Sequence, residues 1–189
     1  MITDKIENYP MLNVLNFYIK EINGFIAGGC FRSIFEGNFP RDIDLFFNTE
    51  EDFLFAKDVY IGEEWKVAYE NENAIGFYKK GKPRVDLVRS IYGTPENIIS
   101  QFDFTIAKFA MDKEKVVYTE TYWRDLHLKR LVCDDTIPKP IGTFERVQKY
   151  AKYGYFLCRE TKVKIIKAIQ VIGQFDNENI SKNLYQGWD

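Results

Sequence analysis

The sequence contains a single histidine, His127, and only three cysteines, Cys30, Cys133 and Cys158, among its 189 residues. One histidine argues against a histidine-based metal site and against a serine–histidine catalytic triad. The cysteines are odd in number and far apart, which matches neither a disulfide framework nor the ligand spacing of a zinc site. These scarcities favour reduced thiols, as in a cytoplasmic protein.

Long hydrophobic runs are also missing. No stretch approaches the roughly 20 apolar residues of a membrane span, and the polar N-terminal segment MITDKIENYP does not look like a signal peptide. Hydrophobic residues nevertheless make up 46% of the chain and aromatic residues 16%, so a folded core is expected rather than disorder. We therefore expect no membrane partner and a cytoplasmic location.

Neither sign of charge dominates, because 26 basic residues nearly balance 28 acidic ones and the net charge is −2. The balance is uneven along the chain. Residues 1–75 carry 14 acidic and 6 basic side chains, a net −8, whereas residues 76–189 carry 14 acidic and 20 basic, a net +6. A basic C-terminal half permits an anionic partner, but ordinary solvated helix faces account for the same charges.

The hydrophobic spacing predicts an α+β fold, with a mixed sheet flanked by helices and then a short helical C-terminal part. Strands are expected at residues 25–27, 42–47, 65–70, 74–79, 84–89, 103–111 and 115–120. Helices are expected at residues 10–22, 30–36, 50–60, a short segment opened by Thr94, 121–131, 143–158, 160–173 and 177–185. We accordingly divide the chain into residues 1–135 and residues 136–189.

Two aspartates lie inside an apolar run near the start of the chain. Asp42 and Asp44 are two residues apart in an expected strand, so they project from one face while Ile43 and Leu45 project from the other. Adjacent carboxylates repel unless a cation lies between them, and oxygen ligands favour a hard cation such as Mg²⁺. Asp86 lies in a second apolar strand and completes a three-carboxylate cluster if the two strands are neighbours. Such a cluster can hold two metal ions.

A glycine pair precedes these aspartates, between an expected strand and an expected helix. Gly28 and Gly29 allow backbone N–H groups to approach phosphate oxygens closely, and Arg32 follows one turn later. A glycine pair alone is usually an ordinary turn. The order of glycines, arginine and aspartates within about 20 residues is more specific, and it points to a bound phosphate chain.

The segments GGCFRS and RDIDLFF resemble the head-domain signature of the DNA polymerase beta-like nucleotidyltransferases. Within that superfamily the chain is most similar to bacterial-type tRNA CCA-adding enzymes and poly(A) polymerases. The likeness continues in the same order through VDLVRS, DFTIAKFAMD, RDLHLKRL and ERVQKYAKYGY, at residues 85–90, 103–112, 124–131 and 145–155. It covers roughly residues 24–155.

The resemblance implies a metal-dependent enzyme that moves a nucleoside monophosphate from an NTP to a hydroxyl and releases pyrophosphate. It assigns the catalytic Mg²⁺ (or Mn²⁺) ions to Asp42 and Asp44, with Asp86 in support. It assigns the triphosphate to Gly28, Gly29 and Arg32. The weaker candidates for nucleotide contacts are Arg89, Asp103, Arg146 and Lys149. An RNA 3′ end, as in tRNA processing, is the first choice of acceptor.

The chain also departs from the family pattern. Gln101 and Phe102 stand where two arginines are expected, and Ile141-Gly142-Thr143 replaces an acidic residue and proline at the start of the next helix. The helical body that holds tRNA in these enzymes is expected to be missing or reduced to a stub, and a compact form of this kind is expected from a phage or mobile element. Two alternatives therefore stay open: transfer to a protein or small-molecule hydroxyl, and a non-catalytic module that binds nucleotide or RNA. Neither the NTP nor the oligomeric state follows from the sequence.

Overall fold

The computed structural model describes residues 1–135 and 137–171, and these form two compact units. The first, called the sheet unit below, comprises Met1–Phe102 and Ala107–Glu120. The second, called the helical unit, comprises Asp103–Ile106 and the described residues from Thr121 onward. The division expected at residue 135 stays a prediction.

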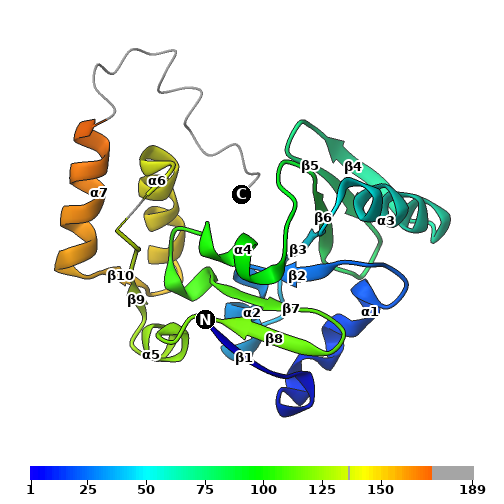
Figure 1. The fold of residues 1–189 in the computed structure, drawn as a ribbon, viewed down its shortest axis with the longest axis horizontal. Coiled ribbons are helices and arrows are strands. Elements are labelled where there is room, and N and C mark those ends of the chain that lie inside the picture. Colours follow the sequence, from blue (N-terminus) through cyan, green and yellow to red (C-terminus); the bar gives the residue numbers. More distant parts are fainter. Residues whose placement is uncertain (136, 172–189) are drawn as a thin grey trace. The chain divides into compact units, whose positions relative to one another are not determined.

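The sheet unit is built on an eight-stranded mixed sheet with the order β1-β8-β7-β2-β3-β6-β5-β4 (Figure 1). Its strands β3 and β6 are parallel, and the other neighbouring pairs are antiparallel. The bounds are β1 Ile2–Lys5, β2 Phe25–Ala27, β3 Asp42–Phe46, β4 Lys66–Glu70, β5 Ala74–Tyr78, β6 Arg84–Val88, β7 Phe109–Met111 and β8 Lys115–Tyr118. Strand β1 is not among the expected strands, because this edge strand is mostly exposed and lacks an apolar face.

The helices of the sheet unit are α1 Asn16–Ile19, α2 Gly29–Phe35, α3 Glu50–Gly62 and α4 Pro95–Ser100. The expected helix at residues 10–22 is instead a 3₁₀ helix, Pro10–Leu15, followed by the single turn α1. The buried side chains of the 3₁₀ helix, Leu12 and Leu15, are three residues apart, which fits three residues per turn. Helix α4 begins as expected, with the Thr94 hydroxyl accepting a hydrogen bond from the Asn97 amide at 3.4 Å.

The two faces of the sheet are covered differently. On one face, α2 packs Phe31 against Phe109 at a ring-centroid distance of 4.6 Å, and α3 packs Tyr60 against Phe77 at 5.4 Å. On the other face, Phe25 and Phe46 stack under α4, whose Ile98 and Ile99 complete the cluster. This second core ends where the polar side chains of β3 begin.

The helical unit contains α5 Tyr122–His127, β9 Arg130–Leu131, α6 Pro140–Ala151, β10 Phe156–Leu157 and α7 Arg159–Val171. The short strands β9 and β10 pair in parallel. Aromatic rings join the helix α6 to its surroundings, since Tyr150 contacts Phe104 at 5.5 Å and Tyr155 at 6.0 Å.

Three further expected elements are corrected. The strand at residues 103–111 is wrong over its first half, where Thr105 bonds to the carbonyl of Val132 and a 3₁₀ turn occupies Thr105–Ala107. The helix at 121–131 ends at His127, because Lys129 has a positive φ of 54°. The helix at 143–158 begins earlier, at Pro140, and ends at Ala151, shortly before Gly154 with φ 82°. The helix expected at 177–185 lies outside the described residues.

The α+β fold class is confirmed, including the mixed sheet and the helices that follow it. Within residues 1–135 and 137–171, no helix combines the length and apolar character needed to cross a membrane.

Candidate functional site

Sheet register brings the three expected carboxylates together. Parallel pairing of β3 with β6 places Asp44 opposite Asp86, and antiparallel pairing of β6 with β5 places Asp86 opposite Gly76. On the far side, Gly76 lies opposite Tyr69 of β4. Directly paired positions point to the same face of a sheet. Asp44, Asp86, Gly76 and Tyr69 therefore form one row across four strands, with Asp42 one step along.

Arg84 was not among the expected site residues, but it lies at the centre of the carboxylate cluster. Arg84 is paired in register with Asp42 and shares a face with Asp86, two residues later on β6. Its Nε donates to both carboxylate oxygens of Asp86, at 2.9 and 3.1 Å, and its Nη2 donates to Asp86 Oδ2 at 2.8 Å. The same Nη2 lies 3.4 Å from Asp42 Oδ2. One guanidinium thus bridges two strands and neutralises part of the negative charge.

Gly76 makes room for Tyr69 in this row. A Cβ atom on Gly76 would lie 2.1 Å from Cε1 of Tyr69, so the ring occupies the space that any other residue would fill. The Arg84 guanidinium carbon lies 5.6 Å from the centre of the Tyr69 ring, within the range of a cation–π contact. Tyr69 therefore walls the site on the side away from Asp44.

Burial and the charge of Asp86 have opposite effects on the pKa of Arg84 and the same effect on the pKa of Tyr69. Asp86 is buried, with 5% of its surface exposed, whereas 42% of the Asp42 side chain is exposed. Burial alone would lower the pKa of Arg84, but its hydrogen bonds and the charge of Asp86 outweigh that effect and raise the pKa. Burial, followed by the charge of Asp86 and a hydrogen bond to it, also raises the pKa of Tyr69. Both side chains thus keep their protons near neutral pH.

The glycine turn lies next to Asp44. Gly28 has φ 103° and ψ −147°, a conformation open only to glycine, and it immediately precedes α2. An added Cβ there would lie 3.6 Å from Asp44 Oδ2. Arg32 is on the same helix, but it is buried and its Nη1 donates to Glu36 at 3.1 Å. The structure therefore places Gly28 and Gly29 beside the carboxylates and holds Arg32 against its own helix.

The remaining expected residues are not part of the carboxylate row. Arg89, which follows β6, pairs with Glu70 at 3.0 Å and also donates to the carbonyl of Asn71, away from the carboxylate row. In the helical unit, the Asp103 carboxylate accepts hydrogen bonds from the Thr143 hydroxyl at 3.0 Å and from Arg146.

Lys149 lies three residues after Arg146 on α6 and is half-buried. The pairing of Asp103 with Arg146 is a contact that spacing alone does not reveal, because 42 residues separate them in the sequence.

A second buried carboxylate, Asp125, belongs to the helical unit. It is fully buried and accepts a hydrogen bond from the Thr105 hydroxyl at 2.8 Å and from Arg124 Nε at 3.0 Å. These contacts satisfy the carboxylate within its own unit, and they give it a role in packing.

The carboxylates suit a hard divalent cation by their chemistry, because carboxylate oxygens are the ligands that Mg²⁺ prefers. Asp42 and Asp44 share a face of β3 and supply two such ligands. As the side chains stand, no three acidic, histidine or cysteine residues within 1–135 and 137–171 are disposed to hold one ion. Asp86 instead directs its oxygens to Arg84. Asp42 and Asp44 are thus suited to bind a metal ion, while the oxygens of Asp86 accept hydrogen bonds from Arg84.

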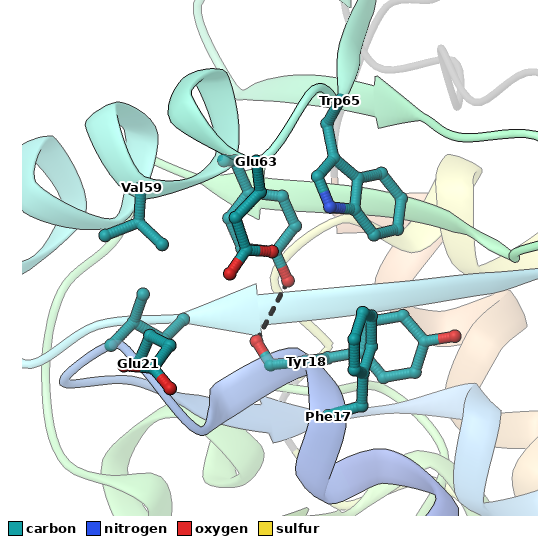
Figure 2. A pocket seen from close by; sticks show the side chains of 8 residues that line it. Phe17, Tyr18, Glu21, Val59, Glu63 and Trp65 are labelled. Atoms are coloured by element: carbon teal, nitrogen blue, oxygen red, sulfur yellow. Dashed lines mark hydrogen bonds between the residues drawn. The ribbon is translucent and has the colours of Figure 1, made fainter.

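A small cavity of about 10 Å³ lies away from these groups, between α1 and α3 (Figure 2). Figure 2 shows Val59, Glu63 and Trp65 on one side and Phe17, Tyr18 and Glu21 on the other. The Tyr60 hydroxyl donates to the Tyr18 carbonyl at 2.9 Å across it. The cavity has room for about one water molecule, so it contributes to packing and not to the carboxylate site.

Sequence reasoning missed Arg84, Tyr69 and Gly76. The signal for Arg84 was available, because the two-residue rule that pairs Asp42 with Asp44 also pairs Arg84 with Asp86. Tyr69 and Gly76 could not be assigned, since their place in the row depends on the register of β4 and β5.

Comparison with known proteins identifies a phage family. A family model described as "Gabija anti-defense 2 family protein" matches residues 2–129. A curated relative, Gabija anti-defense 2 of Bacillus phage SPbetaL7, is 23% identical over 150 residues, which cover 78% of this chain and 38% of the relative. The chain thus spans less than half the length of that relative.

Solved structures with a similar fold are CCA-adding enzymes. A CCA-adding enzyme in complex with CTP superposes with a TM-score of 0.71 at 15% identity, over 97% of this chain and 49% of that one. The Thermotoga maritima enzyme complexed with tRNA gives 0.68 at 16% identity, over 97% and 50%. A tRNA nucleotidyltransferase with a primer tRNA and an ATP analogue gives 0.56 at 21%, over 78% and 47%. These likenesses show the nucleotidyltransferase fold, and the chain spans about half the length of these enzymes.

Proposed function

Since the chain belongs to the Gabija anti-defense 2 family and has the nucleotidyltransferase fold, we propose that it is a metal-dependent nucleotidyltransferase that counteracts host defence. It transfers a nucleoside monophosphate from an NTP to a hydroxyl and releases pyrophosphate. One observation carries this proposal: the parallel register of β3 and β6 gathers Asp42, Asp44 and Asp86 on one face, beside the turn at Gly28.

The proposed roles follow from position and chemistry. Asp42 and Asp44 would hold Mg²⁺ or Mn²⁺, and the bound ion would neutralise charge on the phosphate oxygens during transfer. The backbone at Gly28 and Gly29 approaches the triphosphate without obstruction by a side chain. Arg32, Arg89, Asp103, Arg146 and Lys149 remain candidates for contacts to the nucleotide on the resemblance alone.

The reaction step balances without a further reactant. The oxygen of the acceptor hydroxyl forms a bond to the α-phosphorus, and the bond between that phosphorus and the oxygen leading to the β-phosphate breaks. Pyrophosphate leaves with the electron pair of the broken bond. The proton of the acceptor hydroxyl passes to a carboxylate, which we assign to Asp86 from its place in the row.

We propose an RNA 3′ end as the acceptor. In the part of the helical unit that the structure describes, 11 side chains are basic and 6 are acidic, a net +5 that suits a polyanion. Solved relatives of the same fold are complexed with tRNA. The host cytoplasm is the proposed location, because the curated relative is phage-encoded.

The test is label transfer from each α-labelled NTP in the presence of Mg²⁺, with tRNA, other RNA and host protein offered as acceptors. We expect label in the RNA fraction from the wild type and a loss of at least about a thousandfold in Asp42→Asn and Asp44→Asn proteins. Asp58→Asn, on the exposed face of α3, is the matched control. Full transfer by the Asp42 and Asp44 variants would show that the site is assigned wrongly.

Two other functions stay open. Transfer to a protein hydroxyl keeps the same chemistry and changes the acceptor, and label in the protein fraction would identify it. A non-catalytic module is favoured by Gln101 and Phe102 at positions where the resemblance expects arginines. NTP binding by calorimetry without turnover on any acceptor would identify that module.

A further inference from the structure

The most unusual feature of the sheet unit is a cation built into a cluster of acids. Three hydrogen bonds join Arg84 to Asp86, and the same guanidinium reaches Asp42 on the neighbouring strand. We propose that Arg84 competes with the divalent ion for Asp86, so that the site excludes metal from Asp86 until the guanidinium is displaced. This inference rests on the proposed metal-dependent function and deepens it by assigning the regulation of the site.

Arg84 and a metal ion compete because the Asp86 carboxylate has only two oxygens. Asp86 has two oxygens, and both accept hydrogen bonds from Arg84 at 3.1 Å or less. A metal ion that binds the same oxygens must therefore break these bonds. Before it arrives, the guanidinium keeps a carboxylate with 5% exposure from being an uncompensated buried charge.

The competition is reversible because the Arg84 side chain can adopt another position. The Arg84 side chain is 29% exposed, and its other partner, Asp42, is 42% exposed. The Tyr69 ring, seated over Gly76, offers a face 5.6 Å from the guanidinium carbon. Rotation of the Arg84 side chain along the Tyr69 ring would release Asp86 without moving a strand. This rotation would break the partly exposed ion pair between Arg84 and Asp86.

The neighbouring groups make the exchange sensitive to the total positive charge. Three negative charges lie close together, on Asp44 and Asp86 in the row and on Asp42 beside it. Arg84 contributes one positive charge to this cluster. A divalent ion brings two positive charges and is the stronger counterion for three acids. With no metal bound, the protein thus stays folded with Asp86 compensated by Arg84, and it changes state when metal and the nucleotide arrive.

The test measures Mn²⁺ affinity directly, by titration with detection of free Mn²⁺ in electron paramagnetic resonance. Arg84→Gln removes the charge and is expected to lower the Kd for Mn²⁺ by about tenfold. Lys57→Gln is the matched control, because Lys57 has a similar side-chain exposure of 31% and pairs with Glu70, outside the row. It should change the Kd by less than about twofold.

An equal or weaker affinity in Arg84→Gln overturns the inference and leaves the proposed function standing, provided that the wild type binds Mn²⁺. Loss of binding in the Asp42→Asn, Asp44→Asn double variant supports the proposed site independently. Absence of Mn²⁺ binding from both wild type and Arg84→Gln overturns the inference together with the metal-dependent function.

A metal-free measurement keeps the counterion role separate from metal affinity. In EDTA, Arg84→Gln should lower the Tm by about 5 °C, because it leaves Asp86 buried without its partner. Adding Asp86→Asn to this variant should restore most of the loss. A Tm that stays low in the double variant would show that Arg84 stabilises the fold by packing and not as the counterion of Asp86.

Discussion

The two units place buried acids in different ways. In the sheet unit, Asp86 and its neighbours are fixed by strand register, and the unit carries 14 basic and 19 acidic side chains, a net −5. In the described part of the helical unit, Asp125 is fixed by side-chain contacts from Thr105 and Arg124, and the net charge is +5.

Asp86 and Asp125 are a natural pair for comparison. Each is nearly or fully buried, and each has one arginine and one hydroxyl group as neighbours. Their neighbours differ, because Asp86 has the carboxylate of Asp44 beside it in the row and that of Asp42 one step along. A buried acid with satisfied bonds is structural by default, and a buried acid among other acids indicates chemistry.

The largest expected effect is a difference in activity between variants of Asp86 and Asp125. Asp86→Asn should lower nucleotidyl transfer by about a hundredfold or more, because it removes the proposed proton acceptor. Asp125→Asn should instead cost about 2 kcal/mol of unfolding free energy and leave the activity of each folded molecule unchanged. Urea unfolding and label transfer on both variants check this. An activity loss in Asp125→Asn at full folding would place that acid in the site as well.

The next effect compares two glycines with positive φ in the sheet unit. Gly28→Ala should lower stability by about 2 kcal/mol and activity by about tenfold, because the residue adopts a glycine-only conformation beside Asp44. Gly37→Ala, with φ 76° and open space around its Cβ, should cost about 1 kcal/mol and no activity. Equal activities of the two variants would contradict a role for the Gly28 turn at the site.

A smaller effect is expected in the helical unit. Arg146→Gln breaks the contact with Asp103 and should raise the KM for the NTP by about tenfold, with Mn²⁺ affinity unchanged. Lys152→Gln, the exposed residue that follows α6, is the control. Steady-state kinetics with each NTP and Mn²⁺ titration provide the two readouts. A change in Mn²⁺ affinity would mean that Arg146 acts on the metal site.

The smallest effect is a dependence of stability on pH. Partial burial would raise the pKa of Glu96, but its own backbone amide, Lys115 and Thr94 outweigh burial and lower it. A lowered pKa gives stability that is present above the unfolded value of about 4.5 and is lost as the pH falls through the folded value. Glu96→Gln should therefore cost less than about 1 kcal/mol at neutral pH and nothing in acid.

Urea unfolding of wild type and Glu96→Gln at about pH 7 and about pH 3.5 measures this difference. The Lys115→Gln variant should behave in the same way, since its Nζ lies 3.1 Å from Glu96. A difference between wild type and variant that grows on acidification would contradict a lowered pKa of Glu96.

Several features were readable from the sequence because they depend on neighbours along the chain. Alternation placed Asp42 and Asp44 on one face of β3, and Thr94 with Pro95 marked the start of α4. The segment at residues 103–111 could not be read in this way. Its apolar pattern suits a strand, but the bonds of Thr105 go to distant partners at Val132 and Asp125.

The sequence by itself determined the fold class and the residues that could carry chemistry, because alternation, glycine turns and the family-like motifs are local. Only the tertiary structure decided what surrounds Asp86. The register of β3, β6, β5 and β4 aligned Asp44, Asp86, Gly76 and Tyr69, and it brought Arg84 between two acids from different strands. Register is set by backbone pairing between distant segments, and no local pattern contains it.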